Sequence, residues 1–416
     1  MLKTKKMKLF IRYTLVLTFL CYAHLGFTSA PTTTPISNTT IAAPTTTASA
    51  TGAAPTSPTC PTGSTNYYSI STFAGNGASG NTDGSSTQAS FGNPHIIVAD
   101  SLGNFYVADS VTATVRKIDP AGNVTTIISG YTASALLIDT TNKNDTLYVV
   151  DYGNGQLKKY NGTAASITAQ NATFTIIASN ASATSTGYAP GAVLNANLRA
   201  WGGLVIDSAG NLYMSDNNQI RKLAPPSGVN TSYTLTTIAG SAQTGFAEGL
   251  CKTALFNGPE GMVISGSGNL YVADKNNHII RKVDLSNNGC MVSTIAGTPN
   301  VAGYSGDCGV AQSAKLNTPT GVTIGNNNIY IADVGNNVIR YMQWSSQIIS
   351  TIAGPVSPVG STPNSGYSDN NGQAIGAQFN NPWRLNVDAA GNVYITDGAN
   401  RRIRKLTFLG VKQGSV

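Results

Sequence analysis

The side chains best suited to chemistry occupy one equivalent position in six repeated segments. Each segment holds a short apolar strand that begins with Pro-x-Gly or a variant of it, and residue x changes from copy to copy. Gly202 is x in the third copy. An imidazole, a carboxylate, a guanidinium and an indole at one place could hold a polar ligand, with the indole stacking on a sugar or peptide. The candidate binding residues, including the residue after the last x, are His95, Ser134, Glu260, Thr320, Trp383 and Arg384.

Acidic and basic residues also recur at fixed places, and there the repetition argues against catalysis. A catalytic acid needs one carboxyl group in an unusual environment, whereas six equivalent pairs indicate hydrogen bonding within each unit. We therefore predict no catalytic residue. The acids that end the second strands are Asp109, Asp151, Asp216, Asp274, Asp333 and Asp397. Their basic partners in the third strands are Arg116, Lys158, Arg221, Arg281, Arg340 and Arg404.

The sequence contains few of the histidine and cysteine residues that bind zinc. Beyond residue 30 the only histidines are His95 and His278, and no Cys-x-x-Cys occurs. A zinc site of three histidines therefore cannot form. We predict no metal and no cofactor.

The elements that position these residues are strands. Each copy has four short runs rich in Val, Ile, Tyr and Thr, which favour strands, and Gly-Asn or Asn-Asn usually separates the first two runs in a tight turn. A single four-stranded unit cannot bury both of its faces, so stacking of six units around an axis is predicted. The repeated cores are 103–118, 145–160, 210–223, 268–283, 327–342 and 391–406.

The strand count predicts how the ring closes. Only five fourth strands follow the six copies, and the missing one is at the other end of the sequence, at 68–75. We expect this N-terminal strand to complete the last blade, because that removes an open seam. The predicted fold is all-β, a six-bladed β-propeller of four-stranded antiparallel blades closed by an N-terminal strand.

These motifs resemble the NHL-repeat family of six-bladed propellers. The family pattern is Pro-x-Gly, an apolar strand, G-N-L-Y-V-A-D, N-x-x-I-R-K and S-T-I-A-G, and residues 259–297 follow it closely. The resemblance extends over about 68–410. It implies the fold more than the function, because such propellers include lyases, receptor ectodomains, RNA binders and adhesion modules.

Long connections lead into most innermost strands and gather on one face, where binding often resides. Four of them share a pattern of an acid followed by Ala-x-Phe or Ala-x-Leu. We expect Ala and Phe to fill gaps between blades and the acid to cap a turn. The second unit has almost no such insert, since Tyr131 directly follows Gly130. The long inserts are 76–93, 180–200, 241–258, 298–318 and 355–381.

The N-terminal residues predict export. Five basic residues precede an apolar stretch over 13–27, so 1–30 is interpreted as a signal peptide, with an uncleaved signal anchor as the alternative. Residues 31–66 are rich in Thr, Pro and Ala and predict a disordered stalk. The propeller is assigned to 67–410 and a C-terminal tail to 411–416. We expect a secreted protein, either free or tethered at the cell surface.

Glycosylation and disulfides are consistent with that compartment. Cys251 and Cys308 lie in equivalent loops of adjacent units and are the expected bridge, which leaves Cys60 with Cys290. The seven predicted N-glycosylation sites are Asn38, Asn123, Asn144, Asn161, Asn171, Asn180 and Asn230.

The charge balance argues against nucleic acid. Five of the 25 basic residues lie in the first 30, which leaves 20 basic against 18 acidic residues. We favour a non-catalytic extracellular module that binds or scaffolds a protein or glycan, with membrane contact only through an uncleaved anchor. The alternative is a secreted lyase or lactonase-like hydrolase working at the channel mouth, so enzymatic activity is left open.

Overall fold

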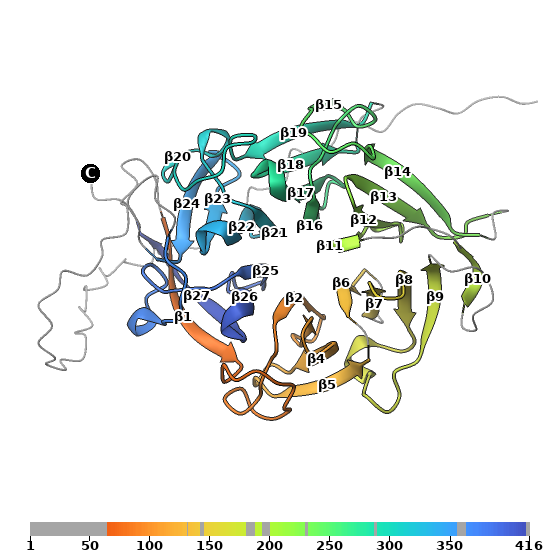
Figure 1. The fold of residues 1–416 in the computed structure, drawn as a ribbon, viewed down its shortest axis with the longest axis horizontal. Helices are drawn as coiled ribbons and strands as arrows, with labels where there is room; N and C mark the ends of the chain where they lie inside the picture. The colour runs from red at the N-terminus through yellow and green to blue at the C-terminus, as the bar shows by residue number, and fades with distance from the viewer. Residues whose placement is uncertain are drawn as a thin grey trace, which may run out of the picture. The chain divides into compact units, whose positions relative to one another are not determined.

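The chain forms a six-bladed β-propeller (Figure 1). The computed structural model describes residues 65–130, 132–141, 145–179, 188–193, 200–228, 232–286, 289–355 and 363–412. Neither the predicted signal peptide nor most of the predicted stalk lies within these ranges. In every blade the four main strands are antiparallel, as the repeat predicts.

Strands are numbered in chain order, and in most blades the first of the four is innermost. Blade 1 consists of β2 (Pro94–Ala99), β3 (Phe105–Asp109), β4 (Thr114–Ile118) and β5 (Val124–Ser129). Blade 2 consists of β6 (Ala133–Asp139), β7 (Thr146–Asp151), β8 (Gln156–Tyr160), β9 (Phe174–Ser179) and β10 (Tyr188–Val193). Blade 3 consists of β11 (Ala200–Ile206), β12 (Leu212–Asp216), β13 (Gln219–Ala224) and β14 (Thr234–Gly240).

Blades 4 and 5 each gain a short strand from the insert that precedes them, and blade 6 takes its fourth strand from the N-terminal end of the propeller. Blade 4 has β16 (Pro259–Ile264), β17 (Leu270–Asp274), β18 (Ile279–Asp284), β19 (Met291–Ala296) and the short β15 (Gly249–Leu250). Blade 5 has β21 (Pro319–Gly325), β22 (Asn328–Asp333), β23 (Val338–Met342), β24 (Ile348–Ala353) and the short β20 (Gly309–Val310). Blade 6 has β25 (Pro382–Val387), β26 (Val393–Asp397), β27 (Arg402–Lys412) and the N-terminal β1 (Thr65–Ala74).

The N-terminal strand closes the ring, as predicted. β1 pairs antiparallel with β27 from Thr65 opposite Lys412 to Ala74 opposite Ile403. Its side chains also join the neighbouring blade, since the hydroxyl groups of Tyr68 and Tyr330 lie 3.2 Å apart. The first and last strands of the propeller are therefore held together by an antiparallel ladder, with register shifts between Tyr67 and Tyr68 and between Thr72 and Ala74.

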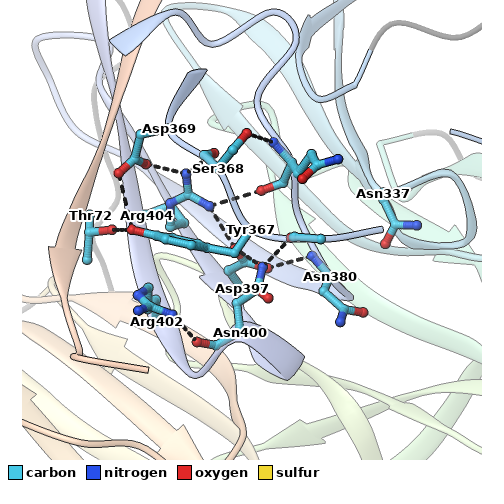
Figure 2. A network of polar contacts seen from close by, with 12 residues as sticks. Thr72, Asn337, Tyr367, Ser368, Asp369, Asn380, Asp397, Asn400, Arg402 and Arg404 are labelled. Atoms are coloured by element: carbon cyan, nitrogen blue, oxygen red, sulfur yellow. Dashed lines mark hydrogen bonds and ion pairs between the residues drawn. The ribbon is translucent and has the colours of Figure 1, made fainter. Parts of the chain in front are cut away.

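A buried arginine ties each long insert to its own blade. In blade 6, Arg404 donates to the backbone carbonyls of Gln378 (3.1 Å) and Ser368 (2.9 Å). It also contacts the carboxylates of Asp397, at the end of the second strand, and Asp369, in the insert (Figure 2). We call this arrangement the insert clasp. It recurs around Arg116, Arg281 and Arg340, which all bind two insert carbonyls.

The pairing predicted within each unit occurs in five blades. The closing acid contacts the basic residue in Asp151–Lys158, Asp216–Arg221, Asp274–Arg281, Asp333–Arg340 and Asp397–Arg404. Blade 1 differs because Arg116 turns to the insert acid Asp83 (2.7 Å), while Asp109 accepts the backbone N–H groups of Gly92 and Asn93. The insert acids thus do more than cap turns, since in three blades they contact the arginine.

The expected disulfide pairing is wrong. Cys251 is bonded to Cys290, with Cα atoms 5.3 Å apart. Cys308 is also disulfide-bonded, but not to Cys251. The physical reason is the short strand β15, which pairs with β19 and places Cys251 beside Cys290 across the ladder. Cys60 lies outside the described residues. The bridge therefore holds an insert onto its own blade rather than joining two inserts.

Deleting β1 should open the propeller. Removal of 65–74 exposes the edge of β27 and leaves Tyr330 without Tyr68, so we expect aggregation or loss of a single cooperative thermal transition. Deletion of 31–58, which leaves β1 intact, is the matched control and should melt like the parent. A β1 deletion that melts at the parental temperature would contradict closure by this strand.

Candidate functional site

The predicted site residues stand at the heads of the innermost strands. His95 is on β2, Ser134 on β6, Glu260 on β16 and Thr320 on β21, while Trp383 and Arg384 are on β25. The strands β2, β6, β11, β16, β21 and β25 surround the axis in Figure 1. Because the long inserts lead into their first residues, the site residues lie at the end of the channel that the inserts flank.

Arg384 crosses this end of the channel. Its Nη1 donates to the carbonyl of Thr320 in blade 5, and its Nη2 lies 3.3 Å from Oε2 of Glu260 in blade 4. Blade 3 lies close as well, because a Cβ atom at Gly202 would come within 2.2 Å of Nη2. One side chain of blade 6 thereby contacts blades on the far side of the axis, and it is only 8% exposed.

Glu260 is held by two cations. Its Oε1 accepts a hydrogen bond from Lys275 Nζ at 2.7 Å, and its Oε2 faces Arg384. Lys275 Nζ also lies 5.5 Å from the centre of the Trp383 ring, within cation–π range. Thr320 joins the same cluster by donating its hydroxyl to the carbonyl of Trp383 (2.7 Å). The structure therefore brings together four of the six predicted site residues, mostly in contact with one another.

His95 and Ser134 lie beside this cluster in blades 1 and 2. Burial, and after it the positive charge of Arg384, lower the pKa of His95 to about 4, so the imidazole is neutral at physiological pH. Within the described part of the chain, His95 Nδ1 and Ser134 Oγ are buried without a hydrogen-bond partner. Their role in binding stays a prediction.

On the other side of Arg384 the channel continues as a cavity of about 220 Å³. Its walls come from the later residues of the six innermost strands, which lead toward the face of the tight turns. Arg384 lies at the end of this cavity, so it separates the cavity from the insert side. The apolar residues that line it include Ile97, Leu136, Leu204, Met262, Val322 and Leu385.

Sequence reasoning missed Lys275. It follows the closing Asp of the second strand in blade 4, and this position also varies between copies, so the same test of local departure from the repeat would have found it. The six residues there are Ser110, Tyr152, Asn217, Lys275, Val334 and Gly398.

Comparison with known proteins identifies the repeat. Residues 69–244 match the family model of the teneurin NHL domain, and residues 256–282 match that of the NHL repeat. The chain is an NHL-repeat β-propeller. The two family matches and the closed ring of six blades confirm the resemblance to NHL-repeat propellers that was inferred from the motifs.

Curated relatives of the NHL propeller match over short segments. Protein SUPPRESSOR OF QUENCHING 1, chloroplastic, of Arabidopsis thaliana is 36% identical over 86 residues, which is 20% of this chain and 8% of that protein. Human Teneurin-4 is 30% identical over 100 residues, 22% of this chain and 4% of that protein. The chain thus spans less than a tenth of the length of these relatives.

A solved structure matches the whole propeller. An auxiliary nutrient binding protein from Bacteroides ovatus ATCC 8483 superposes with a TM-score of 0.60 and 18% identity, over 84% of this chain and 78% of that chain. This likeness concerns the fold alone.

Among the described residues, no group of three or more His, Cys, Asp or Glu side chains is arranged so that it could hold a metal ion. No helix in the described part is long and apolar enough to span a membrane.

His95 should make stability fall in mild acid. Its folded pKa, about 4, lies below the unfolded value of 6.5, so the unfolded chain takes up the proton first. The contribution is fully present above pH 6.5 and is lost as pH falls toward 4, by up to about 1.4 kcal/mol per pH unit. Denaturant titrations of wild type and His95→Gln between pH 7.5 and 4.5 should show a flatter dependence in the variant. Equal slopes would mean that His95 titrates normally.

Glu260→Gln should destabilise the propeller. The substitution leaves Arg384 and Lys275 without the carboxylate that both contact, and we expect a loss of about 1.5–3 kcal/mol in the free energy of unfolding. Gln243→Glu, a carboxamide-to-carboxylate change at an exposed side chain, is the control and should change little. If the two variants unfold at the same denaturant concentration, the cluster around Glu260 contributes no stability.

Proposed function

We propose that this NHL propeller is a non-catalytic extracellular module that binds or scaffolds a protein or glycan. The observation that carries the proposal is how Glu260, the carboxylate among the predicted site residues, is engaged. It is engaged by both Lys275 (2.7 Å) and Arg384 (3.3 Å), and the surrounding cluster links three blades. A carboxylate held in this way serves as a rigid structural hub and is poorly suited to accept a proton from a substrate.

The proposed location outside the cell is supported by the N-terminal sequence and by the surface. The predicted signal peptide and the Thr-, Pro- and Ala-rich segment precede the propeller in the sequence. Three of the predicted glycosylation sites, Asn123, Asn161 and Asn171, are exposed, as attachment of a glycan requires. Asn38, Asn144, Asn180 and Asn230 lie outside the described residues.

The insert face offers a docking surface over blades 6, 1 and 2. Trp383 is partly exposed beside Lys275, and the turns between the second and third strands carry Val111, 66% exposed, and Tyr152, 42% exposed. Blade 2 has no long insert of its own to cover this side. Aromatic side chains next to a cation are the residue types that often anchor protein and sugar partners.

The test is a binding screen with a matched pair of tryptophan variants. The secreted propeller is screened against extracellular proteins and a glycan array, and every hit is measured again with Trp383→Ala and Trp344→Ala. Trp344 is also exposed but lies in a turn between third and fourth strands, on the opposite face. We expect Trp383→Ala to weaken binding by roughly 1–3 kcal/mol and Trp344→Ala to leave it unchanged.

Two results would contradict the proposal. Equal loss in both tryptophan variants would move the site away from the insert face. Turnover of a lactone or of a lyase substrate that disappears in Glu260→Gln would instead make the mouth a catalytic centre.

A further inference from the structure

Blade 3 has an arginine at the clasp position, Arg221, to which no described residue of an insert is hydrogen-bonded. The side chain of Arg221 is 19% exposed, whereas the equivalent arginines of blades 1, 4, 5 and 6 are 0% exposed. Among the described residues, Arg221 makes one hydrogen bond, from Nη1 to Oδ2 of Asp216 (3.2 Å). A guanidinium carries five donors, so Arg221 retains capacity that its counterparts use on their inserts.

A carboxylate has a defined place in the completed clasps. In blade 1, Asp83 contacts Arg116 at 2.7 Å and accepts the backbone N–H of Thr126 at 3.0 Å. In blade 4, Glu248 accepts the N–H of Thr294 at 2.6 Å. In blade 3 the residue equivalent to Thr126 and Thr294 is Thr237, and it is exposed.

The sequence before blade 3 cannot supply this carboxylate. Residues 180–200 contain no Asp or Glu. The described part of this insert, β10, pairs with β9 of blade 2, which has no long insert of its own. The insert that precedes blade 3 therefore contributes to the edge of the neighbouring blade.

The outer strand of blade 3 is correspondingly exposed. Leu235 is only partly buried, whereas the equivalent Val124, Val292 and Ile349 are 0–1% exposed. No other strand in the described ranges pairs with the outer edge of β14. The chain from 223 to 247 carries no charged residue, so the cations next to this edge are Arg221 and Lys222 of β13, which lie opposite Thr237 and Thr236. An open, uncharged edge beside an accessible guanidinium is complementary to an extended acidic segment.

We propose that Arg221 and the backbone N–H of Thr237 bind an Asp or Glu side chain on an extended segment of a partner protein, which runs along the edge of β14. The occupant's chemistry is set by the chain's own inserts, which present one carboxylate to the same two groups in blade 1. Charge-assisted hydrogen bonds of this kind are strong and orient the partner. The site is on the rim of blade 3 and does not depend on the function proposed for the channel mouth.

The experiment uses the blade 1 insert as probe. A fluorescent peptide with the sequence of residues 78–91, ASGNTDGSSTQASF, is titrated with the intact propeller by anisotropy, next to the same peptide carrying Asp83→Asn. We expect the acidic peptide to bind and the Asn peptide to bind about tenfold more weakly, with affinity falling as salt rises. Arg221→Lys should also weaken binding, because it keeps the charge but loses the planar fork.

A matched pair of edge variants tests the location. Thr236→Glu places a negative charge on the exposed edge of β14, and Thr125→Glu places one at the equivalent exposed position of β5 in blade 1. Both should melt like wild type, and only Thr236→Glu should abolish peptide binding. Equal binding of the two peptides, equal effects of the two variants, or no binding at about 1 mM peptide would overturn the proposal. Self-association that Thr236→Glu abolishes would assign the edge to a second copy and would overturn it too.

Discussion

The propeller depends on burying one guanidinium in each of four blades. Transfer of a charge from water into a packed sheet is costly unless carboxylates and carbonyls surround it. Arg281 illustrates the balance, since it is fully buried against Asp274, and burial raises the pKa of Asp274 to about 6 although Arg281 opposes that shift. The two insert carbonyls that Arg281 binds complete its shell. The inserts are consequently part of the core and not free loops, which gives the insert face a defined shape.

Blades 2 and 3 depart from the insert clasp, and in both blades the surface around the third and fourth strands differs from that of the other blades. Blade 2 has Lys158 in place of arginine, paired with Asp151 at 2.7 Å, and no insert to bind. The outer strand of blade 2 is covered instead by β10, from the insert before blade 3. Blade 3 is left with an accessible Arg221 and an exposed β14. The lack of a long insert before blade 2 thus accounts for two features. It leaves the insert face uncovered at blade 2, and it leaves the outer edge of β14 in blade 3 unpaired among the described strands.

Features that repeat were predictable from the sequence, and pairings between unlike elements were not. The blades and the closing strand β1 follow from strand periodicity and from counting fourth strands, because backbone pairing in a closed ring leaves no alternative. The disulfide was missed because equivalent loops of adjacent blades were assumed to meet. Cys251 instead meets Cys290 through β15, a two-residue strand that periodicity does not reveal. The clasp acids were found as a pattern, but their arginine partners lie more than 30 residues away along the chain.

Residues that depart from the repeat are of two kinds. Some have their polar groups bonded within the fold, and others stay accessible to a ligand. Arg384 replaces a glycine that recurs at 203, 261 and 321. Its guanidinium, however, already contacts Glu260 and the backbone carbonyl of Thr320. Sequence alone does not tell whether such a side chain turns into the channel or toward solvent. Trp383 departs from the repeat and stays partly exposed, whereas Arg221 keeps the repeated residue type and differs from its equivalents in being 19% exposed. Since a group whose hydrogen bonds are satisfied inside the fold has little left to offer a ligand, the incompletely engaged departures are the stronger candidates for recognition.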